Sequence, residues 1–360
     1  MSKVPVRVDG RFRLGDVLGS GSYSVVYRTQ NIINNDVVAI KLEPIVNNLS
    51  SMQHEYHILK QLEGGVGIPH VLWFGRESMY HALALNLLGS SLHDIFLIHG
   101  QKFSLHTVVN LGDQLLSRLK YIHSHNYVHG DIKPQNVMVG LNDLRHTVFI
   151  IDFGIVKEYC NTSTRMHIPF RHDRRLTSTP AFASINNHLG VEPGRRNDLE
   201  SLTYMLIYFL CGSLPWLSDG HEKLSSAAIL ECKVNTTVEV LCHGIPVKFA
   251  SILIYSRSLA FSEDPDYDYL CSLLHGLRVT LPTSATCLLD FGKPDDLSTH
   301  TPAIPDEYWV TEVTPPYPLK ATPLRRSTSP NHMPQLQLHA AKVADAVDGT
   351  HVATTPVNLV

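Results

Sequence analysis

The most informative stretch of this sequence reads His129-Gly130-Asp131-Ile132-Lys133-Pro134-Gln135-Asn136. It places a carboxylate, an ammonium and an amide on a short loop after a long segment of helical apolar spacing. Asp131 can accept a proton from a hydroxyl group, Lys133 can neutralise charge on a phosphoryl group, and Asn136 can hold a metal ion. Asp152-Phe153-Gly154 follows a short apolar run, where a carboxylate suits Mg²⁺ that bridges phosphates. Together the two stretches point to phosphoryl-transfer chemistry.

Two further motifs precede this loop. A glycine-rich turn, Gly19-Ser20-Gly21-Ser22-Tyr23-Ser24, separates two expected strands, and glycine there lets backbone N–H groups approach phosphate oxygens. A plain hairpin turn is an equally good interpretation of this segment alone. Lys41, in Val38-Ala39-Ile40-Lys41, falls in an expected strand, where a phosphate ligand and the carboxylate of Glu55 would compensate its charge. The alternative for Lys41 is an exposed position on an edge strand.

Hydrophobic periodicity predicts an α+β fold in two lobes. Strands are expected over 12–18, 25–29, 37–43 and 148–151, and an apolar run covers 83–88. Helices are expected over 55–62, after a cap at Ser104, and over 199–210, which is apolar almost all round and should be central and buried. A small β-rich lobe (about 11–86) and a larger helical lobe (about 90–282) would then hold a ligand between them.

Composition excludes several classes of protein. The 360 residues are 44% apolar and 18% charged with a formal net charge of −3, so we expect a globular chain without the basic field that binds nucleic acid. The six cysteines form no C-x-x-C pair, which favours free thiols. The first residues lack the apolar core of a signal peptide, and the most apolar stretch, 202–210, is too short to span a membrane. We therefore expect an intracellular protein without membrane insertion, cytoplasmic, with a nuclear location left open.

The end of the chain differs in composition from the rest. Ten of the 21 prolines lie within 283–360, and the periodicity fades there. We expect 1–282 to form one domain and 283–360 to be a mostly disordered, proline-rich tail. Large aromatic residues are unusual in such a tail, so Tyr308-Trp309-Val310 suggests docking on the domain, with autoinhibition as one form, or on a partner.

The motifs resemble those of the casein kinase 1 family of Ser/Thr protein kinases, from about residue 12 to 277. Ala183-Ser184-Ile185-Asn186 stands where most kinases have Ala-Pro-Glu. The other specific segments are Glu63-Gly64-Gly65-Val66-Gly67-Ile68-Pro69, His167-Ile168-Pro169-Phe170, Arg195-Arg196-Asn197-Asp198-Leu199-Glu200-Ser201-Leu202, Gly212-Ser213-Leu214-Pro215-Trp216 and Pro265-Asp266-Tyr267-Asp268-Tyr269-Leu270. The resemblance implies a bilobal protein-kinase fold, ATP and Mg²⁺ as cofactors, protein Ser/Thr substrates and a monomeric enzyme.

The resemblance also implies a role for each candidate site residue. Asp131, Lys133 and Asn136 would be catalytic, and Asn136 and Asp152 would hold Mg²⁺. The ATP phosphates would lie under Gly19, Ser20 and Gly21 beside Lys41, which Glu55 would hold. Residues 86–88 would be the hinge and Asp198 would brace the catalytic loop. The adenine would be lined by Leu18, Val26, Ala39, Leu85 as gatekeeper, Leu88 of the hinge, Met138 and Ile151, although such apolar residues would equally suit a plain core.

Several positions depart from the family pattern. Gly130 stands where an arginine normally ties the loop to the activation segment, so we expect activity without phosphorylation of 152–186. Ser24 replaces the third glycine of the turn, and Asn86 replaces an acidic hinge residue. Ala181 occupies the position of the arginine that reads a priming phosphate, which predicts weakened recognition of primed substrates.

The sequence leaves two alternatives to an active protein kinase. A pseudokinase would act as a nucleotide-binding scaffold or interaction protein, but such proteins usually lose the residues that stand here as Lys41, Asp131 or Asp152. A small-molecule kinase of the same fold is disfavoured by the Ser184-Ile185-Asn186 segment.

Overall fold

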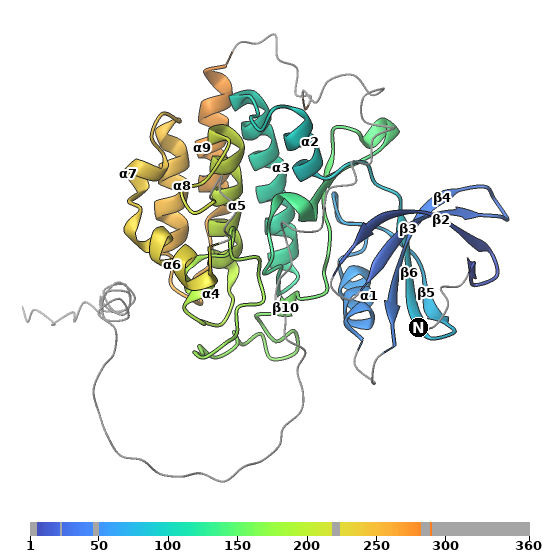
Figure 1. Ribbon diagram of the computed structural model, residues 1–360. Coiled ribbons are helices and arrows are strands. Elements are labelled where there is room, and N and C mark those ends of the chain that lie inside the picture. Colours follow the sequence, from blue (N-terminus) through green and yellow to red (C-terminus); the bar gives the residue numbers. More distant parts are fainter. Residues whose placement is uncertain (1–5, 22–23, 46–49, 218–223, 282–288, 290–360) are drawn as a thin grey trace, which may run out of the picture. The chain divides into compact units, whose positions relative to one another are not determined.

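The computed structural model describes residues 6–21, 24–45, 50–217, 224–281 and 289 (Figure 1). The described chain starts with an antiparallel sheet of six strands in the order β1-β2-β3-β4-β6-β5. The strands are β1 (Arg7–Val8), β2 (Phe12–Ser20), β3 (Val25–Asn31), β4 (Val37–Pro44), β5 (Val71–Glu77) and β6 (Tyr80–Asn86). The strands predicted over 12–18, 25–29 and 37–43 are confirmed. The apolar run at 83–88 starts in β6 and continues past its end.

Alternation along β4 and β6 gives this sheet two different faces. Ile40, in the middle of β4, is fully buried in an apolar cluster made by the sheet itself. Its neighbours Ala39 and Lys41 point to the opposite face, because successive side chains of a strand alternate. There they stand opposite Leu85 and Leu83 of β6. Leu83 belongs to a second apolar cluster, whose members come mostly from the helical lobe. The strand alternation therefore turns Lys41 toward the helices.

Helix α1 (Ser51–Gln61) packs on β5 and β6. It begins four residues before the predicted segment 55–62. Ser50 accepts a hydrogen bond from the backbone N–H of Gln53 at 3.1 Å and so caps the helix one turn earlier. In the first turn only Met52 is apolar, so the apolar periodicity gives little signal there.

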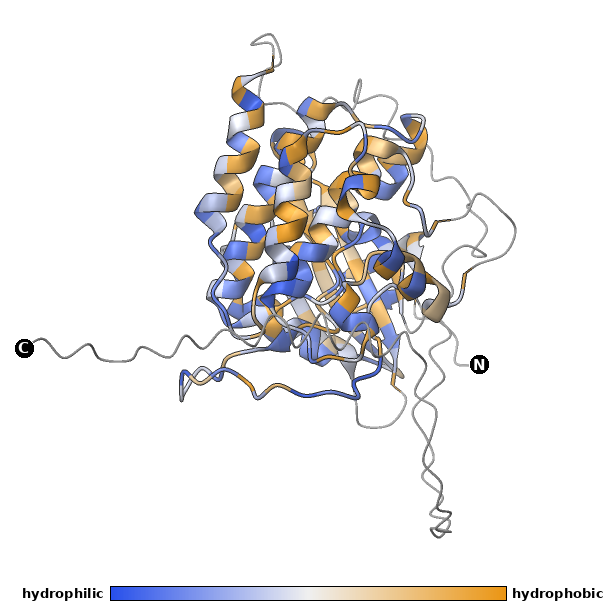
Figure 2. Cartoon of the chain, turned by 90° about the vertical axis from the view of Figure 1, so that its left-hand side faces the viewer, coloured by the Kyte–Doolittle hydropathy of each residue, from blue (hydrophilic) through white to orange (hydrophobic). Residues whose placement is uncertain are grey.

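The second lobe is mainly helical, with α5 (Arg195–Cys211) in its interior (Figure 1). Helix α3 begins at the predicted cap, Ser104, and α5 encloses the predicted central helix, with most of its residues buried. Helices α3 and α8 pack on α5, and α9 packs on α3. In Figure 2 most helices carry both hydrophobic and hydrophilic residues, as expected where one side is buried. The helices are α2 (Leu92–Ile98), α3 (Leu105–Ser124), α4 (Ile185–His188), α5 (Arg195–Cys211), α6 (Ser226–Asn235), α7 (Val238–Leu241), α8 (Val247–Ser258) and α9 (Tyr267–Val279).

Short strands between α3 and α4 carry the motif-bearing loops. Strand β7 (Tyr127–Val128) pairs with β10 (Lys157–Glu158), and β8 (Val137–Val139) pairs with β9 (Val148–Ile150). The predicted strand at 148–151 is confirmed as β9. The loop 129–136 lies between β7 and β8, and Asp152 follows β9, so both motifs leave small sheets at fixed points.

Of the tail predicted for 283–360, only residue 289 is described. The suggested docking segment at 308–310 lies outside the described residues. Leu289 is 4% exposed and belongs to the apolar cluster of the helical lobe. Among the described helices, none has both the length and the apolar character that a membrane crossing requires.

Candidate active site

The loop 129–136 is held in place by one carboxylate of the central helix. Asp198, near the start of α5, accepts the backbone N–H groups of His129 at 2.7 Å and of Gly130 at 2.8 Å. The Nε2–H of His123 donates to the same carboxylate at 2.9 Å. Burial alone would raise the pKa of Asp198, but these donors outweigh it and hold the pKa below its usual value. The carboxylate is therefore charged, and it fixes the backbone just before Asp131.

Gly130 has a backbone conformation that explains why glycine stands there. Its φ is +81°, in the left-handed region that side chains rarely tolerate. An added Cβ would meet only Ile155 Cδ1, at 3.9 Å, so space is not the constraint. The Gly130 carbonyl accepts a hydrogen bond from the Ser178 hydroxyl. In place of an arginine side chain, the chain has a tight turn whose backbone groups bind Asp198 and Ser178.

Asp131, Lys133 and Asn136 converge on one point, as the sequence predicted. Lys133 Nζ lies 2.7 Å from Asp131 Oδ2, and Asn136 Nδ2 donates to the same oxygen at 3.1 Å. The backbone N–H of Thr179 donates to Asp131 Oδ1 at 2.8 Å, and Lys133 also donates to the Thr179 hydroxyl at 2.8 Å. Asp131 is thereby oriented by groups from two separate segments.

Lys41 is held from two sides. Its Nζ lies 2.7 Å from Glu55 Oε2 of α1 and 3.3 Å from Asp152 Oδ1. Glu55 is almost fully buried and also accepts the backbone N–H of Phe153 at 3.3 Å. Burial lowers the pKa of Lys41, but the two carboxylates outweigh it, and the pKa lies above its usual value. The predicted Lys41–Glu55 pair is present, and the lysine remains charged.

The residues proposed for a magnesium ion have suitable chemistry. Asp152 adopts a positive φ of +66°, and its side chain is 47% exposed, so its carboxylate is accessible. Burial works against its charged form, yet Lys41 and Lys133 outweigh this and keep the pKa of Asp152 below its usual value. Asn136 uses its amide nitrogen to reach Asp131, which leaves its amide oxygen for a cation. A charged carboxylate and an amide oxygen are ligands that Mg²⁺ accepts.

The apolar residues assigned to the adenine site lie on the six-stranded sheet and on or next to the small β8–β9 sheet. Val26, Ala39 and Leu85 occupy neighbouring strands, with Val26 opposite Lys41 and Ala39 opposite Leu85. Met138 lies in β8, and the Ile151 backbone N–H donates to the Asn136 carbonyl at 2.9 Å, beside Asp152. All five side chains are half-buried, and Leu85 packs against the apolar cluster of the helical lobe.

The remaining predicted nucleotide residues lie at the edges of this region. Leu18 is 40% exposed on β2, where Gly19 stands opposite Val26. Leu88, after β6, is half-buried. Ser20 ends β2 and the exposed Gly21 follows it, whereas Ser22 and Tyr23 lie outside the described residues.

Sequence reasoning missed several residues that support the site. Thr179 and Ser178 bind the catalytic loop, and the Tyr267 hydroxyl hydrogen-bonds with Nδ1 of His123, the histidine that supports Asp198. These contacts join segments far apart in the chain. The sequence carries no local signal for them, because Ser, Thr and Tyr are common on surfaces.

The comparison with known families agrees with this geometry. The sequence model of the family described as Protein kinase domain matches residues 12–252, about two thirds of the chain. The matched region includes Lys41, Glu55, Asp131, Asp152 and Asp198, whose contacts are given above. The β-rich first lobe and the helical second lobe are the two lobes of the kinase fold. The chain belongs to the protein kinase domain family.

Proposed function

We propose that this chain is an active Ser/Thr protein kinase of the casein kinase 1 type, which transfers the γ-phosphoryl group of ATP to serine and threonine hydroxyls of proteins. One observation carries the proposal: the site has two sets of polar residues, and the members of each set already contact one another. Lys41, Glu55 and Asp152 form one set, and Asp131, Lys133 and Asn136 form the other. A pseudokinase would have no need of both.

In this proposal each residue does what its contacts allow. Asp131 accepts the proton of the substrate hydroxyl, since its carboxylate is oriented by Thr179 and Asn136. Lys133 neutralises charge on the γ-phosphoryl group during its transfer. Lys41, on β4 of the sheet, holds the remaining phosphates of ATP. Asp152 and Asn136 would hold Mg²⁺, which when bound supplies further neutralisation of phosphate charge. The protein's contribution is positioning and electrostatics.

The casein kinase 1 type is supported by the segment in place of Ala-Pro-Glu. Ser184 caps α4 by accepting the backbone N–H of Asn187 at 3.1 Å. Asn197 of α5 donates to Ser184 Oγ at 2.7 Å and to Asn187 Oδ1 at 2.6 Å. These buried polar residues anchor the end of the activation segment to the central helix by hydrogen bonds between neutral side chains. The Ser-Ile-Asn segment thus has a clear structural role here.

The experiment is phosphate transfer from labelled ATP with Mg²⁺ to casein. We expect the wild type to label casein on serine and threonine only, as read by phosphoamino-acid analysis. Asp131→Asn should lower kcat by at least about 100-fold and leave nucleotide affinity unchanged. Asp143→Asn, an exposed aspartate after β8, is the matched control and should keep full activity. A wild-type protein that binds ATP without any transfer would establish the pseudokinase alternative instead.

A further inference from the structure

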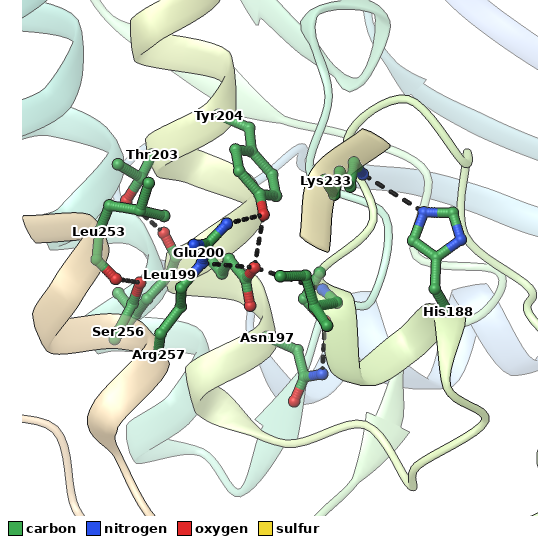
Figure 3. A network of polar contacts seen from close by, with 12 residues as sticks. His188, Asn197, Leu199, Glu200, Thr203, Tyr204, Lys233, Leu253, Ser256 and Arg257 are labelled. Atoms are coloured by element: carbon green, nitrogen blue, oxygen red, sulfur yellow. Dashed lines mark hydrogen bonds and ion pairs between the residues drawn. The ribbon is translucent and has the colours of Figure 1, made fainter. Parts of the chain in front are cut away.

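A buried lysine outside the site described so far binds the segment next to the catalytic loop. Lys233, in α6, has no exposed side-chain surface. Its Nζ donates to the carbonyl groups of Pro180 at 2.8 Å and of Ala183 at 2.6 Å. Figure 3 shows the amine turned toward the ring of His188, 3.3 Å away. The rings of Tyr204 and Trp216 lie 4.9 and 5.1 Å from it.

This lysine is not there to form an ion pair. Within the described part of the chain, no carboxylate lies at ion-pair distance from Lys233. Glu200, the acidic residue that acts on Lys233 electrostatically, instead accepts from the Tyr204 hydroxyl at 2.6 Å and pairs with Arg257 at 3.3 Å (Figure 3). Burying an amine without a carboxylate is costly, and an apolar side chain of similar length would pack there at less cost. The two backbone carbonyls are the specific partners that account for it.

Two other side chains bind the same segment. Trp216 Nε1–H donates to the Ala181 carbonyl at 2.7 Å, and the ring Nε2–H of His188 donates to the Pro180 carbonyl at 2.9 Å. Three carbonyls of residues 178–183 are therefore fixed by the buried side chains of Lys233 and Trp216. The other end of the segment reaches that loop, because Thr179 contacts Asp131 and Lys133 directly.

We propose that Lys233 is a positioning residue for the protein substrate: it sets the shape of residues 178–183, the segment along which a polypeptide must lie to bring a hydroxyl group to Asp131. The proposal rests on the proposed function, since it assigns the substrate side of that same site. Lys233 itself touches neither Asp131 nor the residues around Lys41. Its loss should therefore weaken binding of the protein substrate and leave ATP binding intact.

The test is a steady-state comparison of wild type, Lys233→Met and the control Lys248→Met, which removes a lysine from α8. For Lys233→Met we expect the KM for casein to rise about tenfold while the KM for ATP and kcat stay within about twofold. A purely structural role would give a different pattern, because a partly unfolded sample loses apparent kcat and keeps both KM values. Lys248→Met should match the wild type.

A second variant keeps the proposal testable if Lys233→Met does not fold. Trp216→Phe removes the donor to the Ala181 carbonyl and keeps a smaller aromatic ring, and the same selective rise in the KM for casein is expected. An unchanged KM for casein in a folded Lys233→Met protein would overturn this proposal. A wild type without transfer to casein would instead overturn the proposed function, so the two failures are distinguishable.

Discussion

Among single residues, Gly130 gives the most direct test of the loop geometry. Because its φ is positive, Gly130→Ala should lower the free energy of unfolding by about 1 kcal/mol. Gly276 is the matched control: it lies inside α9, and an added Cβ would meet nothing within 4 Å. Gly276→Ala should raise the free energy of unfolding by about 1 kcal/mol, because alanine favours helix. Chemical denaturation of both variants measures this. Equal shifts of the same sign would show that the turn at Gly130 is not strained.

Ala181 bears on substrate choice. Its side chain is buried and its carbonyl is bound by Trp216, so this position presents no cation to an incoming phosphate. A peptide with phosphoserine three residues before the target serine should therefore have nearly the same kcat/KM as the same peptide with plain serine. An advantage of about a hundredfold, close to 2.7 kcal/mol, would show that another cation reads the phosphate.

Among the elements, the activation segment (152–186) has an anionic partner for two of its cations shortly after its end. Glu192, almost fully buried, lies 3.4 Å from Lys157 Nζ and 2.5 Å from Arg174 Nε. The three residues border a pocket of about 330 Å³ next to α1. Glu192 thus already neutralises part of the positive charge of Lys157 and Arg174, and Gly130 adds no guanidinium, whereas Arg171 also lines the pocket.

We therefore expect phosphatase treatment of the purified protein to leave its activity within about twofold. The measurement compares treated and untreated samples of the full chain and of a chain ending after residue 290, so that effects of the tail are separated. A loss of activity of about tenfold or more in the shorter protein would mean that a phosphate on the segment is required.

The start of helix α1 and the buried lysine of helix α6 are features that the sequence could not predict. Strands β2, β3 and β4 and helices α3 and α5 follow from periodicity and capping, because their apolar faces repeat along the chain. Helix α1 was predicted too short, since its first turn has a single apolar residue, Met52, and the Ser50 cap marks its start. The pair Lys41–Glu55 followed from the motifs. Lys233 did not, because a lysine on a helix normally indicates an exposed face, and its burial depends on contact with residues 50 positions away.

For the molecule as a whole, Leu289 shows that the domain uses apolar surface beyond its last described helix. The side chain is 4% exposed in the large apolar cluster. Leu289→Ala should lower the free energy of unfolding by about 2 kcal/mol, the cost of removing a buried leucine. Ile254→Ala, at a position 53% exposed on α8, is the control and should change it much less. If both variants unfold alike, Leu289 does not contribute to the core.

The buried amine of α6 also makes global stability depend on pH. Burial lowers the pKa of Lys233 from 10.5 to about 7, with Glu200 opposing the shift and Arg257 adding to it. Between these values the unfolded chain binds more protons than the folded one, so stability rises with pH through this window. The nearby His188, whose pKa is lowered to about 4 by burial and by Lys233, acts in the same direction at lower pH.

Comparison of wild type with Lys233→Met isolates this effect. The destabilisation caused by the substitution should grow by about 2 kcal/mol between pH 7 and pH 9, because only the wild type gains from losing the proton. Denaturant unfolding at the two pH values measures it, and Lys248→Met serves as the reference for a lysine elsewhere. A penalty that does not change with pH would mean that Lys233 keeps its proton throughout.

The single carboxylate that holds the catalytic loop also has a consequence during synthesis. The N–H groups of His129 and Gly130 find their acceptor in Asp198, which leaves the ribosome only after the loop and the whole activation segment. Until α5 has formed, those groups have only water as a partner, and Asp131 has no fixed orientation. A nascent chain can therefore fold its sheet first and remain inactive. The catalytic loop therefore takes its final geometry only when α5, which has more buried residues than any other described helix, is in place.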